Sequence, residues 1–194
     1  MRTAIMIKGN KIELVPATID DRYNVYNWCF QSETTKSHSG FPDYPEAPIA
    51  TWEQFCEDYT DYYFTGSQPS NGRVFIILHD GKPIGFINYS SFHLKPRISE
   101  LDICIGREAN CGKGFGTEAI VLLGDYLNKV MGIHDLIIRP SSKNTRAIQS
   151  YKKAGFVYTD TPPCRYLKDE YVSIYGDGDY GAGGSVLLVK RYDT

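Results

Sequence analysis

A glycine-rich segment between a strand pattern and a helix pattern most strongly constrains what this chain can fold into. Gly112, Gly114 and Gly116 follow an alternating apolar stretch at residues 100–105 and precede an amphipathic stretch at residues 117–131. Glycine tolerates positive φ and lets a ligand approach the backbone, while the first turn of a helix offers unpaired N–H groups. The segment therefore predicts a strand–loop–helix unit whose main-chain amides bind an anionic phosphate, although a glycine turn without a ligand would give the same pattern.

Two well-known phosphate-binding loops do not fit this segment. A Walker A loop needs Gly-x4-Gly-Lys-Ser/Thr, but five residues separate Gly106 from Gly112, and Lys113 is followed by Gly114. A dinucleotide fingerprint, Gly-x-Gly-x-x-Gly, would need glycine at position 117, which is Thr117. Each motif fails by one position, so neither nucleotide-binding class is expected.

A second motif lies about thirty residues downstream and reads Asn144-x-x-Ala147-x-x-x-Tyr151-x-x-x-Gly155-Phe156. Together with the glycine segment, it resembles the acyl-CoA-binding core of the GCN5-related N-acetyltransferase (GNAT) superfamily. That signature is Gln/Arg-x-x-Gly-x-Gly/Ala followed by Asn-x-x-Ala-x-x-x-Tyr-x-x-x-Gly-Phe. The second half matches in full.

The first half of the signature departs from the family pattern at one position. It reads Cys111-x-x-Gly114-x-Gly116, with cysteine in place of the basic or amide residue. The resemblance covers roughly a quarter of the chain. The departure is expected to weaken one contact to the cofactor rather than abolish the site, because the main chain does most of the binding.

Length and composition are typical of one soluble domain. The 194 residues carry a net charge of −2, which indicates no preference for nucleic acid or membrane surfaces. No apolar run is long enough for a membrane span, and no signal peptide is recognised. Five irregularly spaced cysteines favour free thiols in a reducing cytoplasm, and no ligand spacing predicts a metal.

The periodicity of the chain predicts an α/β fold made of one domain, residues 1–194. Strands are expected at residues 11–17, 73–79, 83–90, 100–105, 136–139, 156–160 and 185–192, and helices at 18–30, 52–64, 117–131 and 144–155. The buried stripe of the third helix is predicted as Ile120, Leu123, Leu127 and Val130. The GNAT resemblance implies a mixed, mostly antiparallel sheet of six to seven strands with about four helices and a V-shaped split between the fourth and fifth strands.

The resemblance also implies acetyl-CoA as co-substrate, with its thioester arm in that split. Backbone amides of the fourth strand would bind the arm, and amides of the glycine segment would bind the diphosphate. The expected cofactor-binding residues are Ile103, Cys104, Ile105, Cys111, Gly112, Lys113, Gly114, Phe115, Gly116, Thr117, Asn144, Ala147, Tyr151 and Lys152.

Acetyl transfer to an amine needs a neutral nucleophile, donors for the oxyanion and a proton for the leaving thiolate. Tyr151 matches the tyrosine that many GNAT enzymes direct at the sulfur, and it is the candidate acid; the alternative is a core tyrosine. Asp102 is the candidate base, with Glu100 on the same strand face as its backup. Both carboxylates could instead be solvated charges at a strand end.

The acceptor site is expected between the first helices and the last hairpin. Acidic and tyrosine residues gather there in the sequence, namely Glu53, Glu57, Asp58, Asp61, Asp177 and Asp179 with Tyr59, Tyr62, Tyr63 and Tyr180. Such a cleft suits a polyamine or aminosugar cation, although a solvated helix face explains the charges equally well. His38 lies in the loop expected to border this cleft.

Three functions follow from these observations. The first is acetylation of a small amine, similar to the aminoglycoside 6′-N-acetyltransferases, with antibiotic resistance as one outcome. The second is N-terminal acetylation of a ribosomal protein. The third is a non-catalytic acetyl-CoA sensor, which the presence of Tyr151 and Asp102 disfavours. The expected partners are acetyl-CoA and a small-molecule or peptide amine, in a monomer or homodimer.

Overall fold

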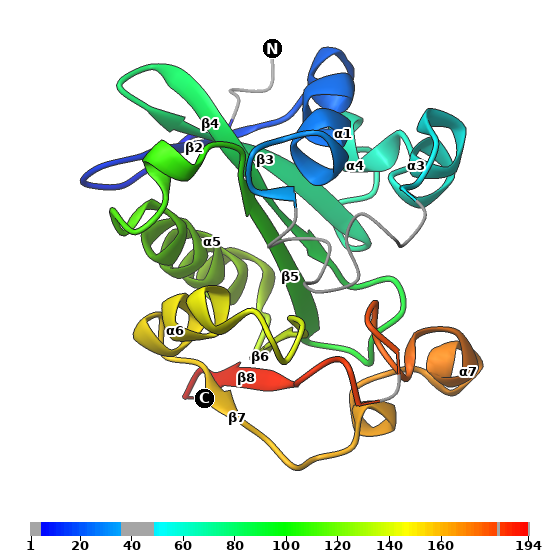
Figure 1. The fold of residues 1–194 in the computed structure, drawn as a ribbon. Coiled ribbons are helices and arrows are strands. Elements are labelled where there is room, and N and C mark those ends of the chain that lie inside the picture. The colour runs from blue at the N-terminus through cyan, green and yellow to red at the C-terminus, as the bar shows by residue number, and fades with distance from the viewer. Residues whose placement is uncertain (1–4, 36–48, 182, 194) are drawn as a thin grey trace.

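The computed structural model describes residues 5–35, 49–181 and 183–193 (Figure 1). The described strands are β1 (Ile7–Lys8), β2 (Glu13–Pro16), β3 (Gly72–His79), β4 (Lys82–Ser90), β5 (Ile98–Ile105), β6 (Asp135–Ile138), β7 (Val157–Tyr158) and β8 (Leu188–Arg191). The described α-helices are α1 (Arg22–Phe30), α3 (Trp52–Asp58), α4 (Tyr62–Thr65), α5 (Phe115–Met131), α6 (Thr145–Lys153) and α7 (Val172–Tyr175).

The described strands form one eight-stranded sheet in the order β1-β2-β3-β4-β5-β6-β8-β7. Neighbouring strands are antiparallel except for β5 and β6, which run parallel. The prediction of a mixed, mostly antiparallel sheet is confirmed, with one strand more than the six to seven expected. The additional strand, β1, is two residues long and too short to show a period in the sequence.

The sheet opens between β5 and β6, as the resemblance implied. The two strands pair only from Ile98–Asp135 to Glu100–Ile137. Beyond Glu100, β5 continues to Ile105 while still paired with β4, and β6 ends at Ile138. One side of β5 therefore has no strand partner from Leu101 onward. Side chains bond part of the backbone there, since the Ile103 amide donates to Asp102 and the Ile105 carbonyl accepts from the Thr34 hydroxyl.

Two hydrophobic clusters hold helices on opposite faces of the sheet (Figure 1). Residues of α5 and α6 pack on one face, where Ile120, Leu123 and Leu127 are fully buried. Val130 was expected in the same stripe but is 65% exposed, because in the last turn of α5 the neighbouring Met131 packs against the cluster in its place. The other face is covered by α1, α3 and α4.

The helix expected over residues 52–64 is two helices. Its start is as predicted: Thr51 accepts a hydrogen bond from the Gln54 amide (3.2 Å), and the Gln54 side chain accepts one from the Thr51 amide (2.9 Å). Tyr59 then leaves the helical conformation, with φ −95° and ψ 70°, and α4 begins at Tyr62. This break directs the Tyr59 side chain toward the sheet, where its hydroxyl reaches β5.

The segment between β7 and β8 contains structure that the sequence did not indicate. Short 3-10 helices at Pro163–Arg165 and Asp169–Tyr171 lead into α7. A third cluster, formed by Leu94, Ile137, Tyr166, Leu167 and Val189, fixes this segment against the sheet. The segment therefore lies at the end of the sheet where β5 and β6 are still paired, next to the point at which they separate (Figure 1).

Candidate active site

The glycine segment forms the connection between β5 and α5. Gly112 and Gly114 have φ of 73° and 87°, and Gly114 is the N-cap of α5. The amides of Phe115, Gly116 and Thr117 occupy the first helical turn, where no intrahelical carbonyl is available to them. A Cβ added at Gly116 would lie 3.7 Å from the Ile103 side chain, so this turn faces β5 at the split. The geometry fits an anionic diphosphate.

Replacing Gly114 with alanine tests whether this turn binds the cofactor, because Gly132 provides a matched control at the other end of α5. Both glycines are left-handed, with φ of 87° and 68°, and an added Cβ meets no atom closer than 3.5 Å at either. Each alanine should therefore cost about 1 kcal/mol of folding free energy through backbone strain. Only Gly114→Ala should raise the KM for acetyl-CoA, on the order of tenfold, by displacing the amides. Equal KM values for the two variants would contradict this placement.

Asp102 lies on β5 just past the last residue that pairs with β6. Its Oδ1 accepts a hydrogen bond from the Ile103 amide (2.8 Å), and its Oδ2 accepts one from the Tyr59 hydroxyl (3.2 Å). The carboxylate is thereby held in one orientation by a side chain from the opposite layer of helices. This is the residue predicted as the base.

The charge of Asp102 acts on three tyrosines from separate elements, of which Tyr59 bonds to it directly. Burial first, and then the charge of Asp102, raise the pKa of Tyr59, Tyr151 and Tyr180 far above the usual value for a phenol. Tyr59 follows α3, Tyr151 lies on α6, and Tyr180 lies in the glycine-rich segment before β8. All three hydroxyls therefore remain protonated at neutral pH and can donate hydrogen bonds or protons.

The start of α6 is formed as the second motif predicts. The Asn144 side chain accepts a hydrogen bond from the Ala147 amide (3.1 Å) and caps the helix. Tyr151 lies one turn further on and is 7% exposed, within the cluster under α5 and α6. Thr117 and Ser150 bond through their hydroxyls (2.8 Å), which ties the first turn of α5 to α6. Both motifs thus line one contiguous region.

The thiols near the site are not nucleophilic. Burial raises the pKa of Cys104 to about 12, and it also raises the pKa of Cys111. The Cys104 sulfur lies 3.3 Å from the Trp28 carbonyl in the cluster beneath α1, on the face away from α5. Only the backbone of Cys104 can take part in cofactor binding. Both thiols stay protonated, which favours direct transfer over a covalent acyl-cysteine.

The lysines expected to contact phosphate differ in how free their ammonium groups are. Lys113 is exposed in the glycine segment and can reach a phosphate. The Lys152 ammonium instead lies 4.3 Å from the centre of the Tyr158 ring on β7, in a cation–π contact. Lys153 is exposed on the last turn of the same helix. A phosphate contact by Lys152 would require this cation–π contact to break.

Glu100, the predicted backup base, is bound by an arginine and a histidine side chain. Its carboxylate accepts hydrogen bonds from Arg139 Nε (2.6 Å) and Nη2 (2.8 Å), and its Oε2 lies 2.8 Å from Nε2 of His93. Burial alone would raise the pKa of Glu100, but the bonds from His93 and Arg139 lower it to about 2. A carboxylate so stabilised in its ionised form is a poor proton acceptor at neutral pH.

The Glu100–Arg139 pair closes the base of the split, since Glu100 is the last β5 residue paired with β6 and Arg139 directly follows β6. At pH 7, Glu100→Gln should lower the free energy of unfolding on the order of 3 kcal/mol, because it leaves a buried guanidinium unpaired. The folded-state pKa is depressed. This contribution is therefore complete above the unfolded pKa of about 4.3 and is lost as the pH falls toward 2. Urea unfolding of both proteins from pH 7 to pH 2.5 should show the difference shrinking with acid; a constant difference would contradict the assignment.

The acidic and aromatic residues expected around the acceptor fall into different environments. Asp61 forms an ion pair with Arg22 (2.7 Å), and the hydroxyl of Tyr63 bonds that of Ser90 (2.6 Å). Asp58 is exposed, and its charge contributes, after burial, to raising the pKa of Tyr175 on α7. His38 lies outside the described residues.

Arg139, His93 and Tyr175 are site-adjacent residues that sequence reasoning missed. Arg139 donates from Nη1 to the Tyr175 carbonyl, and the His93 ring lies 5.1 Å from that of Tyr175. A single arginine after a buried strand gives no local signal of a partner about forty residues earlier. The pairing of β5 with β6 brings Arg139 to Glu100, and packing of Tyr175 against the third cluster brings α7 to them.

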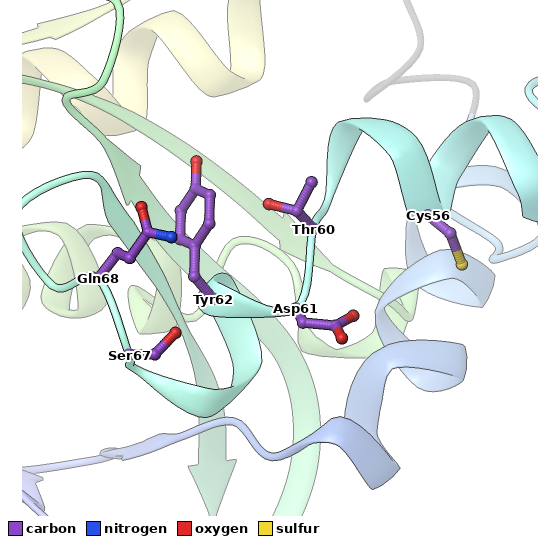
Figure 2. A pocket seen from close by; sticks show the side chains of 6 residues that line it. All are labelled: Cys56, Thr60, Asp61, Tyr62, Ser67 and Gln68. Carbon is purple, nitrogen blue, oxygen red and sulfur yellow. The ribbon is translucent and has the colours of Figure 1, made fainter.

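A surface pocket of about 410 Å³ lies at α3 and α4 (Figure 2). It is lined by Cys56, Thr60, Asp61, Tyr62, Ser67 and Gln68. Figure 2 shows the Tyr62 ring projecting from the start of α4, with Thr60 and Gln68 to either side in the view. Neither Asp102 nor Tyr151, the predicted base and acid, lines this pocket.

Comparison with known proteins identifies the family. The model of the acetyltransferase (GNAT) domain matches residues 11–157, which is most of the chain. The chain belongs to the GNAT family of acetyltransferases, and it is therefore an N-acetyltransferase with acetyl-CoA as its acetyl donor.

Solved structures share the fold at low sequence identity. An aminoglycoside acetyltransferase, AAC(6')-Ib, crystallised with coenzyme A and kanamycin, is 19% identical with a TM-score of 0.65, over 93% of this chain and 94% of that chain. A spermidine N-acetyltransferase from Vibrio cholerae, in complex with CoA and spermine, is 17% identical with a TM-score of 0.66 (94% and 96%). A ribosomal-protein-S5-alanine acetyltransferase from Vibrio fischeri is 14% identical with a TM-score of 0.68 (97% and 97%).

The described residues provide neither a metal-binding cluster nor a membrane-spanning helix. Within the described residues, His, Cys, Asp and Glu side chains form no group of three or more that could hold a metal ion. No described helix combines the length and the apolar character that crossing a membrane requires.

Proposed function

We propose that this enzyme transfers the acetyl group to a primary amine of a small cationic molecule, such as an aminoglycoside or a polyamine. The observation that carries the proposal is the position of Asp102, which lies where β5 has no partner on its β6 side and accepts a hydrogen bond from the Tyr59 hydroxyl. Its charge also raises the pKa of Tyr151 and Tyr180, after burial. A carboxylate attracts a cationic amine, and aromatic faces favour cations. The folds of an aminoglycoside and a spermidine acetyltransferase are compatible with this acceptor class.

The cofactor would be held by the backbone of the glycine segment and of β5. Amides from Gly112 to Thr117 would bind the diphosphate, with Lys113 contributing charge. The thioester arm would lie along the side of β5 that has no strand partner, beyond Glu100. When bound, acetyl-CoA supplies the activated acetyl group.

The residues around Asp102 would then move two protons. Asp102 attracts the ammonium form of the acceptor and accepts a proton from it, directly or through water, so that a neutral amine attacks the thioester carbonyl. As the carbon–sulfur bond breaks, Tyr151 donates its phenolic proton to the departing thiolate. Its raised pKa keeps the phenol protonated before the transfer, and the burial that disfavours the tyrosinate also disfavours a thiolate in the same site, which makes the departing sulfur a stronger base. We propose Asp102 and not Glu100 as the base, because the Glu100 carboxylate is neutralised by Arg139.

An acceptor panel tests this proposal. Thiol release from acetyl-CoA should be measured with kanamycin-type aminoglycosides, with spermidine and spermine, and with peptides that begin in alanine. Turnover with at least one small polycation, and background rates with the peptides, is the expected result. Selective turnover of peptides would instead favour an N-terminal acetyltransferase and overturn the proposal.

Five free cysteines and the use of acetyl-CoA support a cytoplasmic location.

A further inference from the structure

The turn between β1 and β2 is fixed against the first turn of α5. Glu118 Oε1 accepts hydrogen bonds from the backbone amides of Asn10 (2.5 Å) and Lys11 (3.0 Å). From the other side, Nδ1 of His79 donates to the Lys11 carbonyl (2.8 Å). A Cβ at Gly9 would lie 2.2 Å from Glu118 Oε1, so this close approach requires glycine. The backbone of Lys11 is thereby held from two sides.

This arrangement places the Lys11 ammonium on the glycine segment. Lys11 Nζ donates a hydrogen bond to the Lys113 carbonyl (3.1 Å), across a separation of 102 residues. The same Nζ lies 3.5 Å from the position that a Cβ would take at Gly114, the N-cap of α5. The side chain of Lys11 is exposed at this point, so a ligand can reach the ammonium.

We propose that Lys11 is a binding residue for the diphosphate of coenzyme A, positioned by Glu118. The inference rests on the proposed cofactor site and adds to it a residue that lies far from both signature motifs. Where the family signature has arginine or glutamine, this chain has Cys111, which provides no cationic or amide donor. An ammonium from the β1–β2 turn compensates for that loss with a charged donor at the same loop.

Two other basic side chains near the loop, Arg146 and Lys152, are engaged elsewhere, whereas Lys113 in the loop is exposed. Arg146 donates to both carboxylate oxygens of Glu108 (2.5 and 3.1 Å), and Lys152 lies over the Tyr158 ring. Lys11, in contrast, interacts with a carbonyl of the loop itself. A diphosphate bound to the loop amides would present its oxygens to that ammonium, and attraction between opposite charges would strengthen binding.

The role of Glu118 gives a test in which two explanations predict opposite signs. A carboxylate in the first turn of α5 repels an anion at that helix end, so by charge alone its removal should tighten cofactor binding. If Glu118 positions Lys11, its removal should weaken binding, because the turn that carries the ammonium is released. The matched control for the lysine is Lys8, which is exposed in the same hairpin and faces Glu13 (3.7 Å).

The experiment is calorimetric titration with acetyl-CoA and with 3′-dephospho-CoA. Lys11→Met should raise Kd roughly tenfold for both ligands, whereas Lys8→Met should leave both unchanged and Lys11→Arg should retain most of the affinity. An effect lost with 3′-dephospho-CoA would mean that Lys11 binds the 3′-phosphate, and it would overturn the assignment. If the wild type binds and Lys11→Met binds equally well, this inference alone is wrong; a wild type that binds neither ligand refutes the cofactor site as well.

Glu118→Ala, alone and combined with Lys11→Met, completes a double-mutant cycle of the two residues. We expect it to weaken acetyl-CoA binding severalfold in the wild-type background and to have no weakening effect when Lys11 is already methionine. Thermal unfolding of each variant separates this result from loss of the fold. Tighter binding by Glu118→Ala alone would show that the carboxylate acts only through its charge, which contradicts the positioning of Lys11.

Discussion

Tyr151→Phe is expected to lower kcat by at least about 100-fold while leaving the KM for acetyl-CoA nearly unchanged. The substitution removes one hydroxyl from a side chain that is 7% exposed and keeps the ring that packs under α5 and α6. Ring packing is therefore preserved, and what disappears is the proton for the leaving thiolate. Steady-state thiol release, with a melting temperature recorded in parallel, measures the effect.

The pH dependence of the wild type adds a second measurement. A phenol with an ordinary pKa near 10 would lose its proton in alkaline assays, and kcat would fall there. Burial and then the charge of Asp102 raise the pKa of Tyr151, so kcat should show no falling limb from this group up to pH 10. Tyr158→Phe is the control, since that tyrosine is exposed on β7 and phenylalanine keeps the ring that contacts Lys152. If Tyr151→Phe has the same kcat as the wild type, Tyr151 is not the acid.

Asp102→Asn is expected to lower kcat/KM for the amine by about 100-fold or more, with acetyl-CoA binding unchanged. Asparagine has nearly the same shape and can still accept the hydrogen bond of Tyr59. The substitution removes the negative charge that attracts the ammonium and the group that accepts its proton. Initial rates at varied amine concentration, together with calorimetry of acetyl-CoA, separate these two effects.

Asp125 is a matched control for Asp102. It accepts a hydrogen bond from the Tyr192 hydroxyl at 3.2 Å, the same distance as in the Tyr59–Asp102 pair, but it lies on α5 near Lys129. Asp125→Asn should therefore affect stability slightly and the kinetics of amine acetylation not at all. Equal kinetic losses in the two variants would mean that the effect of Asp102 is structural, and the base assignment would then fall.

Local patterns were sufficient to predict the elements that we propose bind the cofactor. Glycines before an amphipathic helix specified the left-handed turn at Gly114, because only glycine takes that φ without strain. Asn144 and Thr51 indicated helix starts that the structure contains, because capping depends on groups three residues apart in the chain. Both family motifs also consist of residues close together in the chain, so they could be recognised in the sequence by their order and spacing.

Contacts between distant segments decided which residues of those elements are available for chemistry. Asp102 and Glu100 are equivalent in the sequence, two residues apart on one strand face, yet Arg139 and His93 bind Glu100, whereas Tyr59 bonds Asp102. No local pattern showed the break at Tyr59, or the Lys11 ammonium at a loop 102 residues away. The sequence by itself determined the fold family and the phosphate-binding loop, since both depend on short-range backbone preferences. Only the tertiary structure selected the candidate base, because the ion pairs and hydrogen bonds that distinguish two like carboxylates come from strands and helices far apart in the chain.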